Sequence, residues 1–366
     1  MDLRKVTPDS YMYENGTNDD GLLTRDKFME VNARMDARRK FLRSECSRLG
    51  LDGSSHKAYA WEYLINRQYH VIWCNIFKAA STSWMYNFNL MANYTAAFLD
   101  KTKEVPLGLA RKKYARPSAE MIKKAQVDSI SFLIVRHPLE RLASAYNDKI
   151  VHAWPKSFHD KMGYRIIRKY RKIPSQPIYV PLLGTGLLSE QDGLGYNSHA
   201  GPVRIGNFTR TIESLRRFLA VFSFTAKLVQ STTQPVPTAR YPMFEEFVSY
   251  VLDEARAKRT LDMHWTPYTD FCTPCKFEFD VVLKFETLDE DQRYLIQLAR
   301  LQDVVKPEWR NSGKGATLHN INHLYSRLKR SQLQGLYNLY KYDFQLFNYT
   351  IESYYEIVQE DEASHG

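Results

Sequence analysis

The sequence predicts an α/β fold in which a central parallel sheet is flanked by helices in a single domain. Residues 71–84 and 130–149 carry this prediction, because each combines a buried strand, a short turn and an amphipathic helix. A third strand-to-helix step, KFETLDED, follows at residues 284–291. With 366 residues, of which 44% are hydrophobic, the chain is long enough to bury a substantial core.

The charge balance of the chain indicates an anionic partner. Fifty-one Lys and Arg residues against 41 Asp and Glu residues give a formal net charge of +10. Nucleic acid, an acidic membrane surface and an acidic polysaccharide would each suit this charge, which does not choose among them. The sequence holds no run of about 18 apolar residues and its start lacks an apolar core, so we expect neither a membrane anchor nor a signal peptide within it.

The domain organisation is predicted from shifts in composition. Residues 1–58 are expected to form a polar, stem-like leader followed by a basic helix, whose apolar residues recur at helical spacing between 27 and 49. The main domain is expected at 59–366. Within it, residues 173–241 hold clustered Gly and Pro without clear periodicity, which predicts an insertion that is either a disordered surface loop or an artefact of gene prediction.

The first strand and turn, VIWCNIFKAASTSW at 71–84, have the composition of a phosphate-binding site. Free N–H groups at a helix start, the helix dipole, the Lys78 ammonium and the Thr82 hydroxyl would converge on one anion. Plain capping by Ser81-Thr82-Ser83, with Lys78 solvated, is the alternative. The glycines of a nucleotide-triphosphate loop are absent, which disfavours an ordinary ATPase or GTPase. We expect the helix to continue from 84 to 97.

The second strand, ISFLIV at 130–135, is followed by a similar turn. Pro138 can open the next helix because its missing N–H would be unpaired there in any case. Arg136 lies at the carboxyl end of the strand, where open α/β sheets bind ligands, and Ser144 follows two helical turns later. Elsewhere, we expect RKKYAR at 111–116 to be an exposed loop and residues 324–349 to form one helix.

Four cysteines, an even number, would suit one or two disulfides in a protein of the secretory pathway. Cys272 and Cys275 form a C-x-x-C motif, but structural zinc would need a second pair at suitable spacing, and Cys46 and Cys74 are distant in sequence. A disulfide or a pair of buried thiols is therefore favoured over zinc. Glycosylation sequons, which also suit the secretory pathway, occur at Asn15, Asn93, Asn207 and Asn348.

Lys78, Thr82 and Trp84, followed by R-x-P-x-x-R-L-x-S-x-Y from Arg136 to Tyr146, resemble the two cofactor motifs of the Golgi sulfotransferases. The resemblance implies a P-loop-like sulfotransferase fold that binds 3'-phosphoadenosine 5'-phosphosulfate (PAPS). The first loop would grip the 5'-phosphosulfate, and Arg136 and Ser144 the 3'-phosphate. The implied cofactor-binding residues are Phe77, Lys78, Ala79, Ala80, Ser81, Thr82, Ser83, Trp84, Arg136, Arg141 and Ser144. Phe77 replaces the usual Pro, and Ser81 the Cys usual in the carbohydrate-modifying branch, but neither change removes a donor group.

Four further motifs resemble the chondroitin and dermatan 4-O-sulfotransferase branch: HW at 264–265, C-x-P-C at 272–275, the K-F-E-T-L-x-E-D step at 284–291 and Y-x-x-D-F-x-x-F-x-Y at 340–349. The likeness covers about residues 60–172 and 243–352. It implies a carbohydrate sulfotransferase acting on the 4-hydroxyl of N-acetylgalactosamine, with other glycan hydroxyls left open by related branches. It also implies a type II protein of the Golgi membrane with a lumenal catalytic domain, although the anchor is missing from this sequence.

Sulfuryl transfer needs a charge-stabilising cation and a general base, and no metal is expected. Lys78 is the predicted cation at the bridging and leaving oxygens. His264 is the predicted base because imidazole titrates near neutrality; Glu286 is the rival, and a core histidine beside Trp265 is the structural alternative. The basic pieces 111–116 and 164–172 are candidate contacts for the uronates of the glycan.

Two other classes of function are less consistent with the sequence. A basic heparin- or nucleic-acid-binding protein without catalysis is disfavoured by the paired strand-turn-helix anion sites and by the lack of a nucleic-acid recognition motif. A kinase that uses ATP is disfavoured because no acidic Mg2+-binding cluster lies beside the loop. We therefore expect no nucleic-acid partner.

Overall fold

The structure is a computed structural model that describes residues 22–53, 57–171, 240–307 and 316–361. In these residues four strands form one mixed sheet. The strands are β1 (Tyr63–Asn66), β2 (Val71–Cys74), β3 (Ile130–Val135) and β4 (Val281–Lys284), in that spatial order. β2, β3 and β4 are parallel, and β1 pairs antiparallel with β2. The predicted parallel sheet is confirmed, whereas the short edge strand β1 was not predicted.

Side chains cover both faces of the parallel strands. Every residue of β2 and β3 is buried, as expected for strands packed between layers of helices. The register places Trp73 opposite Phe132, and their rings are stacked with centroids 6.2 Å apart. This packed centre fixes the positions of the strand ends and of the turns that follow them.

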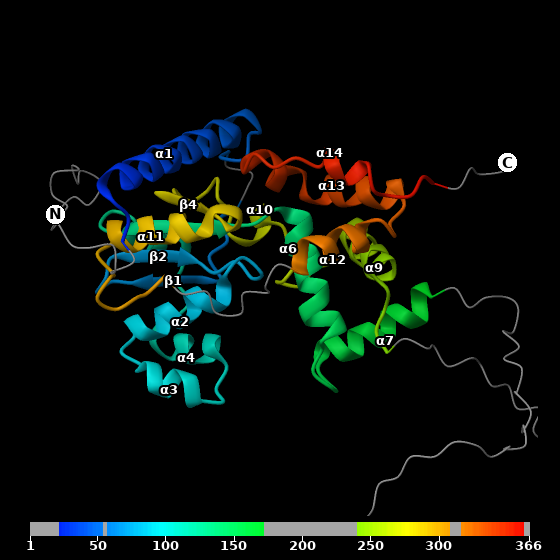
Figure 1. The fold of residues 1–366 in the computed structure, drawn as a ribbon, viewed down its shortest axis with the longest axis horizontal. Coiled ribbons are helices and arrows are strands. Elements are labelled where there is room, and N and C mark those ends of the chain that lie inside the picture. The colour runs from blue at the N-terminus through cyan, green and yellow to red at the C-terminus, as the bar shows by residue number, and fades with distance from the viewer. Residues whose placement is uncertain (1–21, 54–56, 172–239, 308–315, 362–366) are drawn as a thin grey trace, which may run out of the picture. The chain divides into compact units, whose positions relative to one another are not determined.

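Helices lie on both sides of the sheet, with α1 (Arg25–Arg48) on one side and α2 (Ser81–Met91) on the other (Figure 1). The apolar stripe predicted for α1 is confirmed, because Phe28, Val31, Met35, Leu42 and Cys46 are all buried in the core of the sheet. The remaining helices of this half are α3 (Ala96–Lys101), α4 (Pro106–Lys113), α5 (Ala119–Ala125), α10 (Tyr268–Phe271), the 3-10 turn η4 (Phe285–Thr287) and α11 (Leu288–Leu298).

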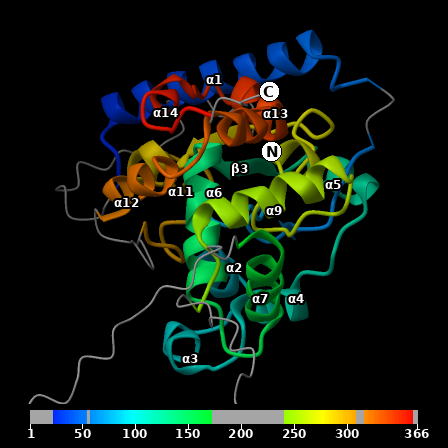
Figure 2. The same cartoon turned by 90° about the vertical axis from the view of Figure 1, so that its right-hand side faces the viewer.

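A second hydrophobic cluster is built from the helix of the second motif and from helices that follow it in the chain. The ribbons of these helices are seen in Figure 2. Trp265 and the apolar faces of these helices form its centre. The helices are α6 (Pro138–Tyr146), the π-helical turn η3 (Asn147–Val151), α7 (Phe158–Tyr170), α9 (Phe244–Arg256), α12 (Ala316–Tyr325), α13 (Arg330–Leu346) and α14 (Glu352–Tyr355). All elements belong to one unit of the chain, which comprises Met1–Arg171 and Tyr241–Gly366.

Two predicted helices differ from the structure. The helix expected at 84–97 ends at Met91, because Asn93 adopts a left-handed φ of +65° before α3 begins. The helix expected at 324–349 is interrupted, and the Gln332 side chain accepts a hydrogen bond from the Lys329 N–H (3.1 Å) where α13 starts.

The prediction of an exposed loop at 111–116 is wrong for its first residues. Lys113 ends α4, so the stretch begins inside a helix. The Arg111 guanidinium forms an ion pair (2.8 Å) with the buried Glu62 carboxylate and donates to the Tyr63 carbonyl (2.9 Å). This arginine braces β1 and is not available to a glycan.

Two disulfides join parts of the chain that are far apart in sequence. Cys46 pairs with Cys275, and Cys74 pairs with Cys272. The C-x-x-C cysteines therefore pair neither with each other nor on a zinc ion. The bridge at Cys74 fastens the end of β2, just before the Lys78 turn, to the 264–275 region.

Some predictions fall on parts of the chain that the structure does not describe. The leader at 1–21, nearly all of the predicted insertion at 173–241, and the sequons at Asn15 and Asn207 are among them. Asn93 and Asn348 are exposed. Among the described helices, none combines the length and the apolar character needed to span a membrane.

Candidate active site

The two predicted cofactor motifs meet at one edge of the sheet. β2 and β3 are parallel neighbours, so their carboxyl ends lie side by side, and each passes directly into its turn. β4 is the next parallel strand and ends beside them. This edge is where open α/β sheets place their ligands.

The first turn has an open, strained backbone. Lys78 and Ala80 adopt left-handed φ values of +68° and +56°, which cost a non-glycine residue roughly 1–2 kcal/mol each. α2 begins at Ser81 without a side-chain capping hydrogen bond, whereas the N-caps of α3, α5 and α7 each accept one. The capping alternative is therefore wrong, and the exposed Thr82 lies at the start of a helix whose positive end suits an anion.

Lys78 reaches from this turn to the second motif. Its Nζ lies 2.9 Å from Oδ2 of Asp148, which also contacts the Lys149 Nζ at 3.2 Å. Burial lowers the pKa of the Lys78 ammonium, and the Asp148 carboxylate partly opposes that shift. The first turn thus carries a largely desolvated cation that is paired with one half-exposed carboxylate among the residues that the structure describes.

Arg136 is held at the start of the second turn by several contacts. Its guanidinium donates to Oε2 of Glu140 from two nitrogens, both at 3.2 Å, and lies over the Phe285 ring at 4.3 Å. The Tyr268 hydroxyl accepts from the Arg136 N–H and donates to its carbonyl. Ser144 is partly buried on α6, one helical turn before Asp148. Arg136 is consequently paired before any ligand arrives.

Arg141 connects the two motifs to the His264 segment. Its side chain is only 1% exposed, and its Nε donates to the Phe77 carbonyl at 3.0 Å. The other guanidinium nitrogens donate to the carbonyls of Thr266 (2.9 Å) and Met263 (3.4 Å). These bonds hold the Phe77 turn and the 263–266 segment together through Arg141, and the predicted cofactor-binding role of this arginine stays a prediction.

The first loop also contains residues that serve the core. Trp84 is fully buried, with its ring centroid 4.7 Å from that of Phe132, and Ala79 is buried as well. Phe77 is partly buried, and its carbonyl is the acceptor for Arg141. Among the predicted loop residues, Lys78, Ser81 and Thr82 have side chains with both the chemistry and the exposure to contact an anion.

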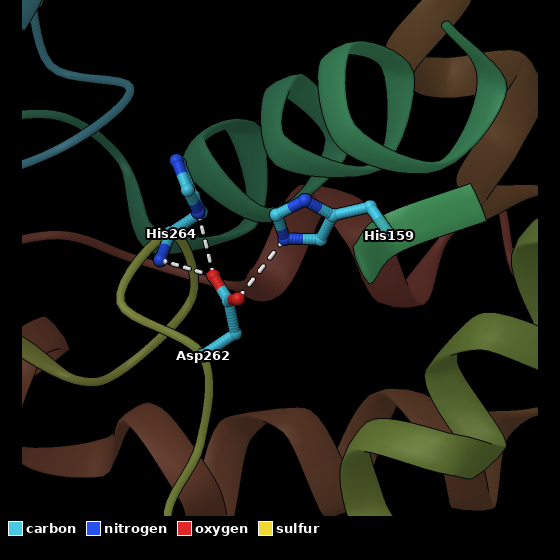
Figure 3. Close-up of side chains that lie close together, drawn as sticks. All are labelled: His159, Asp262 and His264. Atoms are coloured by element: carbon cyan, nitrogen blue, oxygen red, sulfur yellow. Dashed lines mark hydrogen bonds and ion pairs between the residues drawn. The ribbon is translucent and has the colours of Figure 1, made fainter. Parts of the chain in front are cut away.

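His264 lies against the first turn and shares a carboxylate with a second histidine (Figure 3). Its Nδ1 is 2.6 Å from Oδ1 of Asp262, and the Nε2 of His159 is 3.0 Å from Oδ2 of the same residue. The His264 ring centroid is 4.9 Å from that of Phe77 and 5.5 Å from that of His159. The predicted base is therefore brought to the Lys78 turn with an orienting carboxylate.

The pKa values of this cluster are shifted in opposite senses by burial and by hydrogen bonding. Burial lowers the pKa of His264, and the hydrogen bond that His264 donates to Asp262 partly opposes this shift. Burial alone would raise the pKa of the Asp262 carboxyl, but the bonds from His159 and His264 hold it well below its usual value. Asp262 is thus ionised, and His264 is held in the neutral form that can accept a proton near pH 7.

The same three side chains are the one group in the described ranges that could hold a metal ion, since their ligand atoms lie within 4.8 Å of one another. However, each carboxylate oxygen of Asp262 already takes one imidazole nitrogen. The hydrogen bonds satisfy the cluster without an ion.

Glu286, the rival base, has both carboxylate oxygens in structural bonds. Oε1 accepts from the His137 N–H at 2.8 Å, and Oε2 accepts from the Tyr349 hydroxyl at 2.9 Å. The carboxylate fastens the turn after β3 to the end of the chain. A base needs a free lone pair directed at the acceptor, so the geometry favours His264.

Sequence reasoning missed Asp262, His159 and Asp148. Asp262 precedes His264 by two residues, so a hydrogen bond between these two side chains could have been predicted from the D-x-H spacing. Asp148 lies one helical turn after Ser144, which was also readable. His159 is 103 residues from Asp262 and carried no signal in the sequence.

Comparison with known proteins agrees with these motifs. A profile described as "Sulfotransferase family" matches residues 61–182 and 209–350. Carbohydrate sulfotransferase 11 of Mus musculus is 25% identical over 299 residues, which cover 80% of this chain and 68% of that protein. Carbohydrate sulfotransferase 9 of Homo sapiens is 25% identical over 340 residues, covering 90% and 63% respectively. Carbohydrate sulfotransferase 10 of Xenopus laevis is 25% identical over 332 residues, covering 85% and 75%. No solved structure matches the chain, and the predicted resemblance to carbohydrate sulfotransferases is confirmed.

Proposed function

The chain belongs to the sulfotransferase family, and from this premise we propose that it moves the sulfuryl group of PAPS to a glycan hydroxyl. The acceptor we propose is the 4-hydroxyl of N-acetylgalactosamine in chondroitin or dermatan. The observation that carries the proposal is that the two anion motifs lie at adjacent strand ends and contact each other. Lys78 forms an ion pair with Asp148, and Arg141 donates a hydrogen bond to the Phe77 carbonyl. A binding protein without catalysis would have no need of a base beside the same turn.

The residues of the site fit the donor nucleotide. PAPS supplies an activated sulfuryl group on a phosphate that becomes the leaving group. The uncapped start of α2, Thr82 and Lys78 bind the 5'-phosphosulfate, where a buried ammonium stabilises charge on the departing oxygen. Arg136 and Ser144 bind the 3'-phosphate, and Arg136 exchanges Glu140 for the phosphate when it does so.

His264 takes the proton of the acceptor hydroxyl. Its Nδ1 is bonded to Asp262, so its Nε2 is the nitrogen that receives the proton. The carboxylate selects this tautomer and stabilises the imidazolium that forms, as in the Ser-His-Asp arrangement. Asp262 and Arg141 are positioning residues in this scheme, because Arg141 holds the carbonyls of the 263–266 segment against the Lys78 turn.

The proposed location is the lumen of the Golgi apparatus, at its membrane. Two disulfides support an oxidising compartment, and the exposed sequons at Asn93 and Asn348 are compatible with it. Tagged protein expressed with its native leader should coincide with a Golgi marker and shift in mass after glycosidase treatment. A cytosolic, unglycosylated product would contradict the location while leaving the chemistry open.

The chemistry is tested by transfer of radiolabelled sulfate from PAPS to desulfated chondroitin, dermatan and other desulfated glycans. We expect transfer to chondroitin or dermatan, with the label at the 4-position after digestion to disaccharides. Lys78→Ala and Arg136→Ala serve as site controls. Folded wild-type protein that transfers nothing would refute the proposal, and label on another hydroxyl or glycan would refute the acceptor alone.

The base is tested by the pH dependence of kcat/KM. Because burial lowers the pKa of His264, the acid limb should lie below the ordinary imidazole value of about 6.5. Asp262→Asn removes the group that raises this pKa, so the limb should move to still lower pH while kcat falls about 10²- to 10⁴-fold.

Glu286→Gln is the matched control, since the amide oxygen can still accept one of its bonds. It should keep the wild-type pH profile. If Glu286→Gln lost the acid limb of the profile while His264→Gln stayed active, Glu286 and not His264 would be the base.

A further inference from the structure

One stretch of surface beside the candidate base combines exposed aromatic rings with cations. Trp154, Phe158 and Tyr164 are 83%, 60% and 51% exposed, and Trp154 is the most exposed large hydrophobic side chain that the structure describes. Rings this exposed cost solvation free energy, so they are expected where a partner covers them.

The turn that presents Trp154 is well ordered by hydrogen bonds. The Trp154 carbonyl accepts from the Ser157 N–H at 3.0 Å, and the Lys156 N–H donates to the Asp160 carboxylate at 2.7 Å. The Ser157 hydroxyl in turn caps α7 by accepting from the Asp160 N–H at 3.2 Å. A ring on such a turn is already placed for binding, which reduces the entropy cost of contact.

The outer face of α7 continues the surface. Its inner positions, Met162, Gly163, Ile166 and Ile167, are buried. On the opposite side, helical spacing brings Phe158, Lys161 and Arg165 into one row. We call the exposed set the aromatic-basic face; it comprises Trp154, Phe158, Lys161, Tyr164, Arg165 and Arg168.

The charge of this face is uniform. Lys161, Arg165 and Arg168 form no ion pair with any residue in the described part of the chain. The only carboxylate of α7, on Asp160, is engaged by the Lys156 N–H. Three unneutralised cations among aromatic rings favour a partner that carries both apolar surface and spaced negative charge.

The aromatic-basic face begins at the proposed catalytic base. The ring centroid of Phe158 is 5.3 Å from that of His159, which is 5.5 Å from that of His264. His264 in turn lies 4.9 Å from Phe77 of the first turn. Phe158 is therefore two ring contacts from His264, and Trp154 precedes Phe158 by four residues on the turn that leads into α7.

We propose that the aromatic-basic face binds the acidic polysaccharide chain on one side of the reacting sugar. Trp154, Phe158 and Tyr164 pack against the apolar faces of sugar rings, while Lys161, Arg165 and Arg168 pair with uronate or sulfate groups. The proposal rests on the proposed function for the identity of the reacting unit. Anionic membrane is the other partner with this chemistry, but the acceptor glycan must pass His264, and a membrane need not.

The test compares Trp154→Ala, Phe158→Ala and Arg165→Ala with Phe98→Ala and Arg43→Ala, which remove an exposed aromatic ring and an exposed cation from elements other than α7 and its neighbour α9. For each face variant we expect the KM for desulfated chondroitin polymer to rise about 10-fold, as truncation of aromatic and Arg anchors commonly does. The kcat, the KM for PAPS and the KM for a short disaccharide acceptor should stay within about twofold, because the site itself is intact.

Binding without turnover separates this proposal from the proposed function. Wild-type protein should be retained on immobilised chondroitin in the absence of PAPS, and the face variants should elute at lower salt. Retention lost in these variants would support the face even if no sulfate transfer were found. Unchanged retention, or effects equal to those of Phe98→Ala and Arg43→Ala, would overturn it. Loss of binding to phosphatidylserine vesicles with chondroitin binding intact would also overturn it, in favour of a membrane.

Discussion

The two strand-turn-helix motifs are alike in sequence pattern but differ in what holds their turns. The first turn has left-handed residues at Lys78 and Ala80, no side-chain cap on its helix, and one cation paired to a half-exposed carboxylate. The second turn runs directly into Pro138, and its Arg136 is buried between Glu140, Phe285 and the Tyr268 hydroxyl. The first is strained and open, and the second is relaxed and already bonded.

This difference indicates a division of work between the motifs. A turn at the positive end of a helix that has no side-chain cap can stabilise the negative charge that develops on the transferred group. In the second turn, Arg136 exchanges one bonding partner for the bound phosphate, and the other contacts of the turn keep the site in place as a frame. Arg141 belongs to the second motif yet donates to the Phe77 carbonyl, so the frame also sets the geometry of the open turn.

The largest effect should come from removing the cation of the open turn. Lys78→Ala should lower kcat by about 10³-fold, as loss of one preorganised donor to a developing charge does, with little change in thermal stability. Lys149→Ala is the matched control, because Lys149 contacts the same Asp148 carboxylate but lies outside the turn. Equal losses in the two variants would show that Asp148, and not the turn, sets the activity.

Removing the frame residue should come next. Arg141→Met leaves the carbonyls of Phe77 and Thr266 without a donor, and the free energy of unfolding should fall by roughly 3 kcal/mol at 1–3 kcal/mol per orphaned group. Arg43→Met removes an exposed arginine paired with an exposed Glu278, and should cost at most about 1 kcal/mol. Urea denaturation measures both. Equal midpoints would contradict the framing role.

The ligand role of the bonded turn is tested with two nucleotides. Arg136→Ala should weaken binding of 3'-phosphoadenosine 5'-phosphate about 10- to 100-fold, the value of a charge-assisted bond to phosphate. Affinity for adenosine 5'-phosphate, which lacks the 3'-phosphate, should change little and so corrects for any general disturbance. Titration calorimetry gives both constants, and a parallel loss for the two nucleotides would make Arg136 structural only.

The features of the two turns that depend on residues close together in the chain could be predicted from the sequence. Buried strands, Lys78 after one strand and Arg136 after the next could be predicted, because parallel strands bring their carboxyl ends together. The strain at Ala80 could not, since no glycine marks it. The same holds for Arg141, whose acceptors are carbonyls of segments about 64 and 125 residues away, and carbonyls leave no residue-type signal.

Long-range pairings were likewise beyond local patterns. The cysteine count suggested one or two bridges, but the partners of Cys272 and Cys275 lie 198 and 229 residues away. The third member of the base cluster, His159, is set by the packing of α7 against the 262–265 segment. Such contacts depend on how helices cross in the second core, which helical periodicity within one segment does not determine.

The smallest expected effect is also the sharpest test of the bonded turn. Glu140 occupies the donors of Arg136 that the 3'-phosphate would use, so it competes with the ligand. Glu140→Gln replaces a carboxylate by a neutral amide and should tighten binding of 3'-phosphoadenosine 5'-phosphate about 3- to 10-fold, as expected for a pair worth roughly 1 kcal/mol. Glu254→Gln breaks an ion pair between Glu254 of α9 and Arg259, which follows that helix, and should leave the affinity unchanged. Weaker binding by Glu140→Gln would mean that the carboxylate orients Arg136 toward the phosphate, and the bonded turn would then be preorganised for its ligand instead of closed to it.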